Sequence, residues 1–139
     1  AECWVYPTAS PSQPIIMGQW SGSNSWAIQM SNNSSRYLRF LTSATGDTVS
    51  STAVALNQWS HVALVRNGSA FAVYLNGTSV ATASSSNALL ASGNALSIGA
   101  NLSGGQPYTG YIDEVRISKM ARYTSNFTAP DESFADKGK

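Results

Sequence analysis

Two Asn-Gly dipeptides, Asn67-Gly68 and Asn76-Gly77, lie in the middle of the chain between short runs of alternating side chains. Asn-Gly is the strongest short signal for a two-residue β-hairpin, because a type I′ turn requires positive φ at both central residues. The two dipeptides therefore predict three short antiparallel strands within Ser60–Ser84. A tight meander in the middle of the chain predicts an antiparallel β-fold.

Turns centred on these dipeptides also predict the register, with Leu64 opposite Phe71, His61 opposite Tyr74 and Val73 opposite Val80. One face of the meander is apolar and is expected to lie in the core: Val62, Leu64, Phe71, Val73, Leu75 and Val80. The other face carries mostly small side chains: His61, Ala63, Val65, Ala70, Ala72, Tyr74, Ala81 and Ala83. This flat face is either covered by a loop or second layer or forms a shallow concave surface, and the sequence leaves both open.

Further short runs of alternating or β-branched residues, separated by turn-forming residues, predict more strands. The expected strands are Glu2–Tyr6, Ile15–Gln19, Trp26–Met30, Tyr37–Leu41, Thr48–Val54, Ala95–Ala100 and Tyr108–Ser118. Only Asn87–Ala91 and Lys119–Arg122 favour short helical turns. In a chain of 139 residues, this many short strands at near-regular spacing indicate a single all-β sandwich domain.

Composition excludes several classes of protein. The formal net charge of +1 gives no field that would favour nucleic-acid binding. The single cysteine, Cys3, can form neither an internal disulfide nor a thiolate metal site, and we expect it to be a small buried side chain. No apolar run approaches the roughly 20 residues of a membrane span. Because the chain begins at Ala1 without Met or a secretory apolar segment, we expect a processed product or part of a longer protein.

Five segments in order resemble one family: Glu2–Pro7, Gln58–Ala63, Val73–Gly77, Leu96–Gly99 and Gly110–Ser118. Their motifs resemble laminin-G-like domains of the concanavalin A-like lectin/glucanase superfamily, of the kind found in phage virion and bacterial surface proteins. The resemblance implies an antiparallel jelly roll over residues 1–128, followed by a polar tail at 129–139. Family members usually carry a strand before the first motif, so its absence predicts an open edge that a partner chain could complete.

The resemblance implies a non-catalytic, lectin-like adhesion or structural module that recognises glycans on a virion or cell surface. Expected partners are glycans or cell-surface polysaccharide, further copies of the chain, and neighbouring virion or surface proteins, with neither nucleic acid nor membrane insertion. The alternative is a structural subunit that assembles into a decoration, fibre or filament without binding a ligand. A glycoside hydrolase is a distant third.

Carbohydrate sites combine exposed aromatic rings with amide and hydroxyl groups, because the apolar face of a sugar stacks on Trp or Tyr. Two predicted loops rich in Ser, Asn and Gly are flanked by such rings. The candidate ligand-binding residues are Trp20, Asn24, Trp26, Asn101, Gln106 and Tyr108. In the alternative interpretation Trp20 and Trp26 pack inside the sandwich, where Trp4 and Trp59 are also expected.

The acidic residues are poorly arranged for catalysis. Asp113 and Glu114 are neighbours on one strand and should face opposite sides, so they cannot flank one glycosidic bond. His61, the single histidine, is expected to be packed and hydrogen-bonded rather than a general base. We therefore expect no enzyme activity and no cofactor. Calcium stays open, with Asp113 and Asp47 as weak candidates against structural and turn roles for the two.

Overall fold

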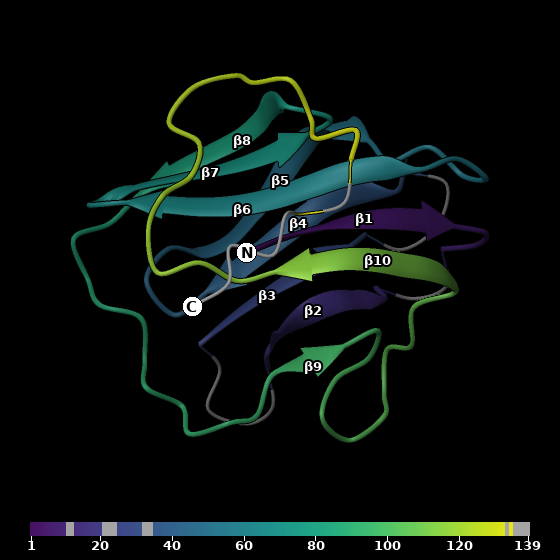
Figure 1. Cartoon of the computed structure of the whole chain (residues 1–139). Helices are drawn as coiled ribbons and strands as arrows, with labels where there is room; N and C mark the ends of the chain where they lie inside the picture. The colour runs from purple at the N-terminus through teal and green to yellow at the C-terminus, as the bar shows by residue number, and fades with distance from the viewer. Residues whose placement is uncertain (11–12, 21–24, 32–34, 133, 135–139) are drawn as a thin grey trace.

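Two five-stranded antiparallel sheets face each other in a sandwich (Figure 1). This computed structural model describes residues 1–10, 13–20, 25–31, 35–132 and 134. Sheet A has the strand order β10-β1-β6-β7-β8, and sheet B has the order β5-β4-β3-β2-β9. The strands are β1 (Glu2–Pro7), β2 (Ile15–Gln19), β3 (Trp26–Met30), β4 (Tyr37–Thr42), β5 (Gly46–Ala53), β6 (Ser60–Asn67), β7 (Ala70–Leu75), β8 (Thr78–Ser84), β9 (Ser97–Ile98) and β10 (Gly110–Arg116).

The predicted strands are confirmed, with small changes at their ends. The expected short helical turns at 87–91 and 119–122 are wrong, and the described residues contain no α-helix. Accordingly, we find in this part of the chain no helix that is long and apolar enough to cross a membrane. The jelly-roll sandwich expected from the sequence is the fold.

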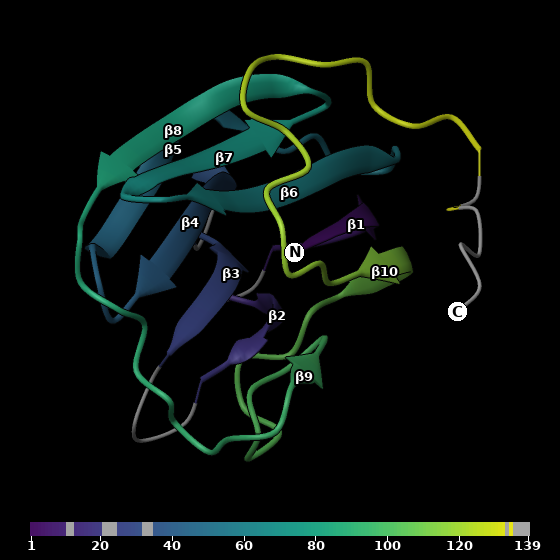
Figure 2. The ribbon, with the colours of Figure 1, turned by 60° about the vertical axis from the view of Figure 1, so that its left-hand side comes forward.

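The core lies between the two sheets, which Figure 2 shows as two facing layers, and strands of both sheets contribute to it. The rings of Phe40 from sheet B and Phe71 from sheet A stack across it, with centroids 6.5 Å apart. Cys3 is fully buried in this core, as expected. Its burial raises the pKa of the Cys3 thiol to about 12. β1 lies between β6 and β10, so the first and last strands of the fold pair with each other in sheet A.

The turn between β6 and β7 differs from the prediction. β6 continues to Asn67, which pairs with Ala70, so Gly68 and Ser69 occupy the turn. The register is therefore displaced by two residues: Leu64 lies opposite Val73, and Ala63 rather than His61 lies opposite Tyr74. A displacement by two keeps each side chain on its predicted face, and the six predicted core residues are buried.

The second turn is of the predicted kind, with positive φ at both Asn76 and Gly77. A bulge between Val73 and Tyr74 then changes the pairing, and Val73 lies opposite Ala81 instead of Val80. A shift by one residue changes the face, so Ala81 and Ala83 pack against the core rather than on the opposite face. That part of the prediction was wrong.

The flat outer face of sheet A is covered. After β10 the chain returns across β6, β7 and β8 on the side turned away from sheet B (Figure 1). Tyr123 and Phe127 stack on each other with centroids 3.5 Å apart and pack beside Tyr74. The Phe127 amide donates to the Gly77 carbonyl at 2.9 Å. This settles the alternative that the sequence left open, and we call residues 117–132 with Phe134 the C-terminal segment.

Candidate functional site

The structure separates the candidate ligand-binding residues into two groups. Trp26 pairs with Gln19 at the end of β2, and Trp20 follows directly after that strand. At the start of β2, the Ile15 amide donates to the Gln106 carbonyl, which places the loop 101–108 at the opposite end of the strand. Asn24 lies outside the described residues. The predicted residues therefore do not converge on one site, and their binding roles stay predictions.

Two of these residues have contacts that organise the fold. The Asn101 Oδ1 atom accepts hydrogen bonds from the amides of Ser103 at 3.1 Å and Gly105 at 2.7 Å, which fixes the loop. Tyr108 packs against the core, and burial raises the pKa of its hydroxyl. That hydroxyl is buried without a hydrogen-bond partner among the described residues. Trp26 also packs against the core, in line with the alternative interpretation, and its half-buried indole lines a cavity as well.

The two candidate metal ligands lie on different sheets. Asp47 on β5 pairs with Arg39, and Asp113 on β10 accepts a hydrogen bond from the Glu114 amide at 2.7 Å. Among the residues that the structure describes, no group of three His, Cys, Asp or Glu side chains could hold a metal. A bulge in the β1–β10 pairing gives Glu114 a φ of 49°, so this strand lacks the strict alternation that the sequence argument assumed.

Glu2 forms a buried polar network beneath the C-terminal segment. Its carboxylate accepts hydrogen bonds from Arg116 Nε at 2.8 Å, the Tyr123 hydroxyl at 2.7 Å and His61 Nε2 at 3.1 Å. Burial alone would raise the pKa of Glu2, but the bonds from these three partners outweigh it and hold the pKa at about 2. His61 is fully buried, which supports the packed, structural interpretation of this residue.

Three aromatic rings meet at the other end of β1 and remain accessible to solvent. The Tyr6 ring contacts Trp59 at a centroid distance of 5.5 Å and Tyr111 at 5.8 Å, both edge to face. Trp59 is 45% exposed and Tyr111 is 64% exposed. The exposed residues Thr8 and Asn57 complete the lining of this shallow depression. We call these five residues the aromatic platform.

Sequence reasoning missed the aromatic platform and wrongly placed Trp59 in the core. Strand alternation could have located Trp59, because it lies two residues before His61 and therefore shares the outer face with it. The meeting of Tyr6 and Tyr111 depends on the pairing of β1 with β10. No local pattern predicts that neighbour, since the two strands lie at opposite ends of the chain.

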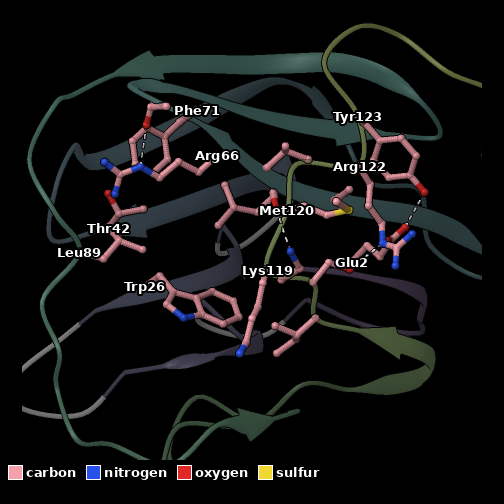
Figure 3. A pocket seen from close by; sticks show the side chains of 17 residues that line it. Glu2, Trp26, Thr42, Arg66, Phe71, Leu89, Lys119, Met120, Arg122 and Tyr123 are labelled. Atoms are coloured by element: carbon pink, nitrogen blue, oxygen red, sulfur yellow. Dashed lines mark hydrogen bonds and ion pairs between the residues drawn. The ribbon is translucent and has the colours of Figure 1, made fainter. Parts of the chain in front are cut away.

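A second cavity, of about 370 Å³, opens at the end of the sandwich where β1 begins (Figure 3). Sheet A, sheet B and the C-terminal segment all contribute to its walls. We call it the end cavity, and its lining includes Trp26, Arg66, Phe71, Lys119, Met120 and Arg122. Aromatic, aliphatic and cationic groups thus share one concave surface.

A family model of the concanavalin A-like lectin/glucanases superfamily matches residues 1–125. The chain belongs to this superfamily. The resemblance seen in the five sequence motifs is therefore confirmed, and the superfamily's jelly roll accounts for the two facing sheets. A comparison with curated proteins finds no match.

Three solved structures with a similar fold are 19–21% identical in sequence to this chain. A protein from Bacteroides ovatus, to which carbohydrate binding is attributed, superposes with a TM-score of 0.74 at 19% identity, over 88% of this chain and 37% of the other. A heptameric SAP-like pentraxin from Limulus polyphemus gives 0.68 at 21% identity, over 88% and 64%.

Domain 4 of AbnA, a GH43 extracellular arabinanase from Geobacillus stearothermophilus solved with arabinotriose, gives a TM-score of 0.59 at 19% identity, over 81% and 55% of the two chains. The chain therefore spans between about a third and two thirds of the length of these structural relatives. At 19–21% sequence identity, these comparisons show a similar fold and not a shared function.

Proposed function

We propose that this domain is a lectin-like module that binds carbohydrate at the aromatic platform without catalysing a reaction. The observation that carries the proposal is the exposure of Trp59 and Tyr111 on either side of Tyr6. Exposed aromatic rings are unfavourable in water, and clusters of them mark binding surfaces. Sugar rings offer apolar faces that match such rings, while Thr8 and Asn57 supply a hydroxyl and an amide for the sugar's hydroxyl groups.

The carboxylates support binding rather than hydrolysis. Glycosidases need two carboxyl groups facing each other across a bond, roughly 5–10 Å apart. Glu2 is engaged by three side chains, Asp47 is paired with Arg39, and Glu114 accepts a hydrogen bond from the Phe134 amide. An assay for reducing ends released from β-glucans and arabinan tests this part of the proposal, and released sugar would contradict it.

The relatives support the same class of ligand, since one is described by carbohydrate binding and another was solved with arabinotriose. Location on a virion or cell surface, and assembly with further copies, follow from the sequence resemblance and stay predictions. Light scattering of the purified chain tests assembly, and a monomer at high concentration would contradict it.

Arabinotriose and a panel of neutral glycans are suitable first ligands, with binding measured by calorimetry. Trp59→Ala and Tyr111→Ala should each weaken binding about tenfold or more, as expected for aromatic residues at the centre of a binding surface. Tyr37→Ala is the matched control, because Tyr37 is a 37% exposed aromatic residue on sheet B. Equal affinity of wild type and Trp59→Ala would contradict the platform assignment.

A further inference from the structure

The end cavity has more positive than negative charge. Arg66, Lys119 and Arg122 line it, and Glu2 is the acidic residue among its described lining residues. The Glu2 carboxylate is already occupied by Arg116, Tyr123 and His61. Arg122 also lies near this carboxylate, with Nε at 3.9 Å, but Glu2 cannot neutralise all of these cations. The cavity therefore attracts anions.

Among the residues that the structure describes, the groups that hold Arg66 in place are uncharged. Its Nε donates to the Gly68 carbonyl at 2.9 Å and its Nη2 to the Asn87 carbonyl at 2.8 Å. Its guanidinium also lies over the Phe71 ring, with Cζ 4.8 Å from the centroid. Neutral carbonyls and a ring fix the position of the guanidinium, and no described carboxylate pairs with it. Arg39 and Arg116, in contrast, both pair with carboxylates.

Trp26 gives the same cavity a flat apolar surface. Its Nε1 donates to Gln19 Oε1 at 3.3 Å, which fixes the orientation of the indole. In Figure 3 the long Lys119 side chain points toward this indole, while Arg66 and Phe71 lie to one side and Arg122 and Tyr123 to the other. The cations are thus spread along the cavity rather than directed at one point.

This arrangement identifies a ligand class. A single small anion is best bound by donors that converge on it. Spread cations beside a fixed indole instead match a chain of sugar rings that carries a carboxylate on each ring. The cavity volume of about 370 Å³ falls within the usual range of ligand sites, roughly 300–1,000 Å³.

We propose that the end cavity binds a segment of an acidic polysaccharide, an oligouronate, with its carboxylates on Arg66, Lys119 and Arg122 and one ring face on Trp26. This site is separate from the aromatic platform, because Glu2 and Tyr6 lie at opposite ends of β1. The two proposed sites can therefore be tested independently of each other.

The test compares oligogalacturonate with its methyl ester, which has the same backbone without the charges, by calorimetry at low ionic strength. Oligogalacturonate should bind the wild type at least tenfold more tightly than the ester does, and added salt should weaken binding. Arg66→Gln and Lys119→Gln should each reduce the affinity about tenfold or more. Lys119 is exposed, so its variant should retain the wild-type melting temperature even if Arg66→Gln loses stability.

Two variants serve as controls. Arg36→Gln removes a guanidinium that also donates to a backbone carbonyl, that of Val54, but lies outside the cavity, and it should bind like the wild type. Trp59→Ala should also bind oligogalacturonate normally. Equal binding of acid and ester, an equal loss in Arg36→Gln, or a loss in Trp59→Ala would each overturn the proposal. Tight binding of sulfated dextran without binding of oligogalacturonate would overturn the assignment to uronates.

Discussion

The Glu2 carboxylate should be one of the largest single contributors to stability in this fold. It is 3% exposed and accepts hydrogen bonds from Arg116, Tyr123 and His61. The pKa of Glu2 falls from an ordinary 4.5 to about 2. At about 1.4 kcal/mol for each tenfold change in proton affinity, this difference corresponds to about 3 kcal/mol of folding free energy at neutral pH.

The sign of the pH dependence follows from the lowered pKa. The folded state prefers the charged carboxylate, so its contribution is complete above the unfolded pKa of 4.5 and is lost as the pH falls through about 2. Glu2→Gln keeps the size of the side chain but removes the charge. The variant should therefore lose about 3 kcal/mol at pH 7, while at pH 2 the two proteins should differ by less than about 1 kcal/mol.

Urea unfolding followed by circular dichroism at pH 7, 4 and 2 measures these differences. Glu132→Gln is the control, since Glu132 is an exposed residue of the C-terminal segment and its loss should change stability by about 0.5 kcal/mol or less. An unchanged free energy of unfolding for Glu2→Gln at pH 7 would refute the reasoning. A loss of equal size at pH 7 and pH 2 would show that the shape of the side chain, and not its charge, matters.

Three further predictions concern packing. Gly77→Ala should destabilise the fold by about 2 kcal/mol or more in thermal melts, because the new Cβ would lie 1.8 Å from the Phe127 carbonyl oxygen. Gly68→Ala is the control: its backbone is similarly strained, but no atom lies near the new Cβ, so it should cost only about 1 kcal/mol. Phe40→Ala, which removes a ring from the middle of the core, should cost about 3–5 kcal/mol in urea unfolding, and a smaller loss would mean that the core collapses around the gap. The Cys3 thiol should react with a thiol reagent only after urea unfolds the chain, because it is buried and burial raises its pKa to about 12; rapid reaction of the native protein would contradict the model of the core.

Local patterns were sufficient to predict the strands and the core face. The Asn-Gly turns and the alternation around them depend on neighbouring residues, and the six core residues of the meander are buried as predicted. The errors in register have two causes. The first turn consists of Gly68 and Ser69 and so lies one residue later than predicted, and a bulge at Val73 and Tyr74 shifts the pairing of β7 with β8. Both depend on how β7 pairs with its neighbours, which the sequence pattern does not specify.

The candidate site could be predicted only in part. Trp26 does line a cavity, but its cationic partners Arg66 and Lys119 come from β6 and from the C-terminal segment. The aromatic platform likewise joins Tyr6 to Tyr111 through strand pairing between the two ends of the chain. Because both surfaces are assembled by long-range pairing, their residues could be recognised by type but not brought together from the sequence.

Carbohydrate binding at the aromatic platform is tested most directly by mapping backbone amide chemical shifts during a titration with a neutral glycan. Arabinotriose, or the neutral glycan that binds most tightly in the calorimetric panel, would serve as the ligand. We expect the largest shifts at Tyr6, Thr8, Asn57, Trp59 and Tyr111, and their disappearance in Trp59→Ala. Shifts confined to the loop 101–108, or the absence of binding by any neutral glycan, would contradict the proposed function.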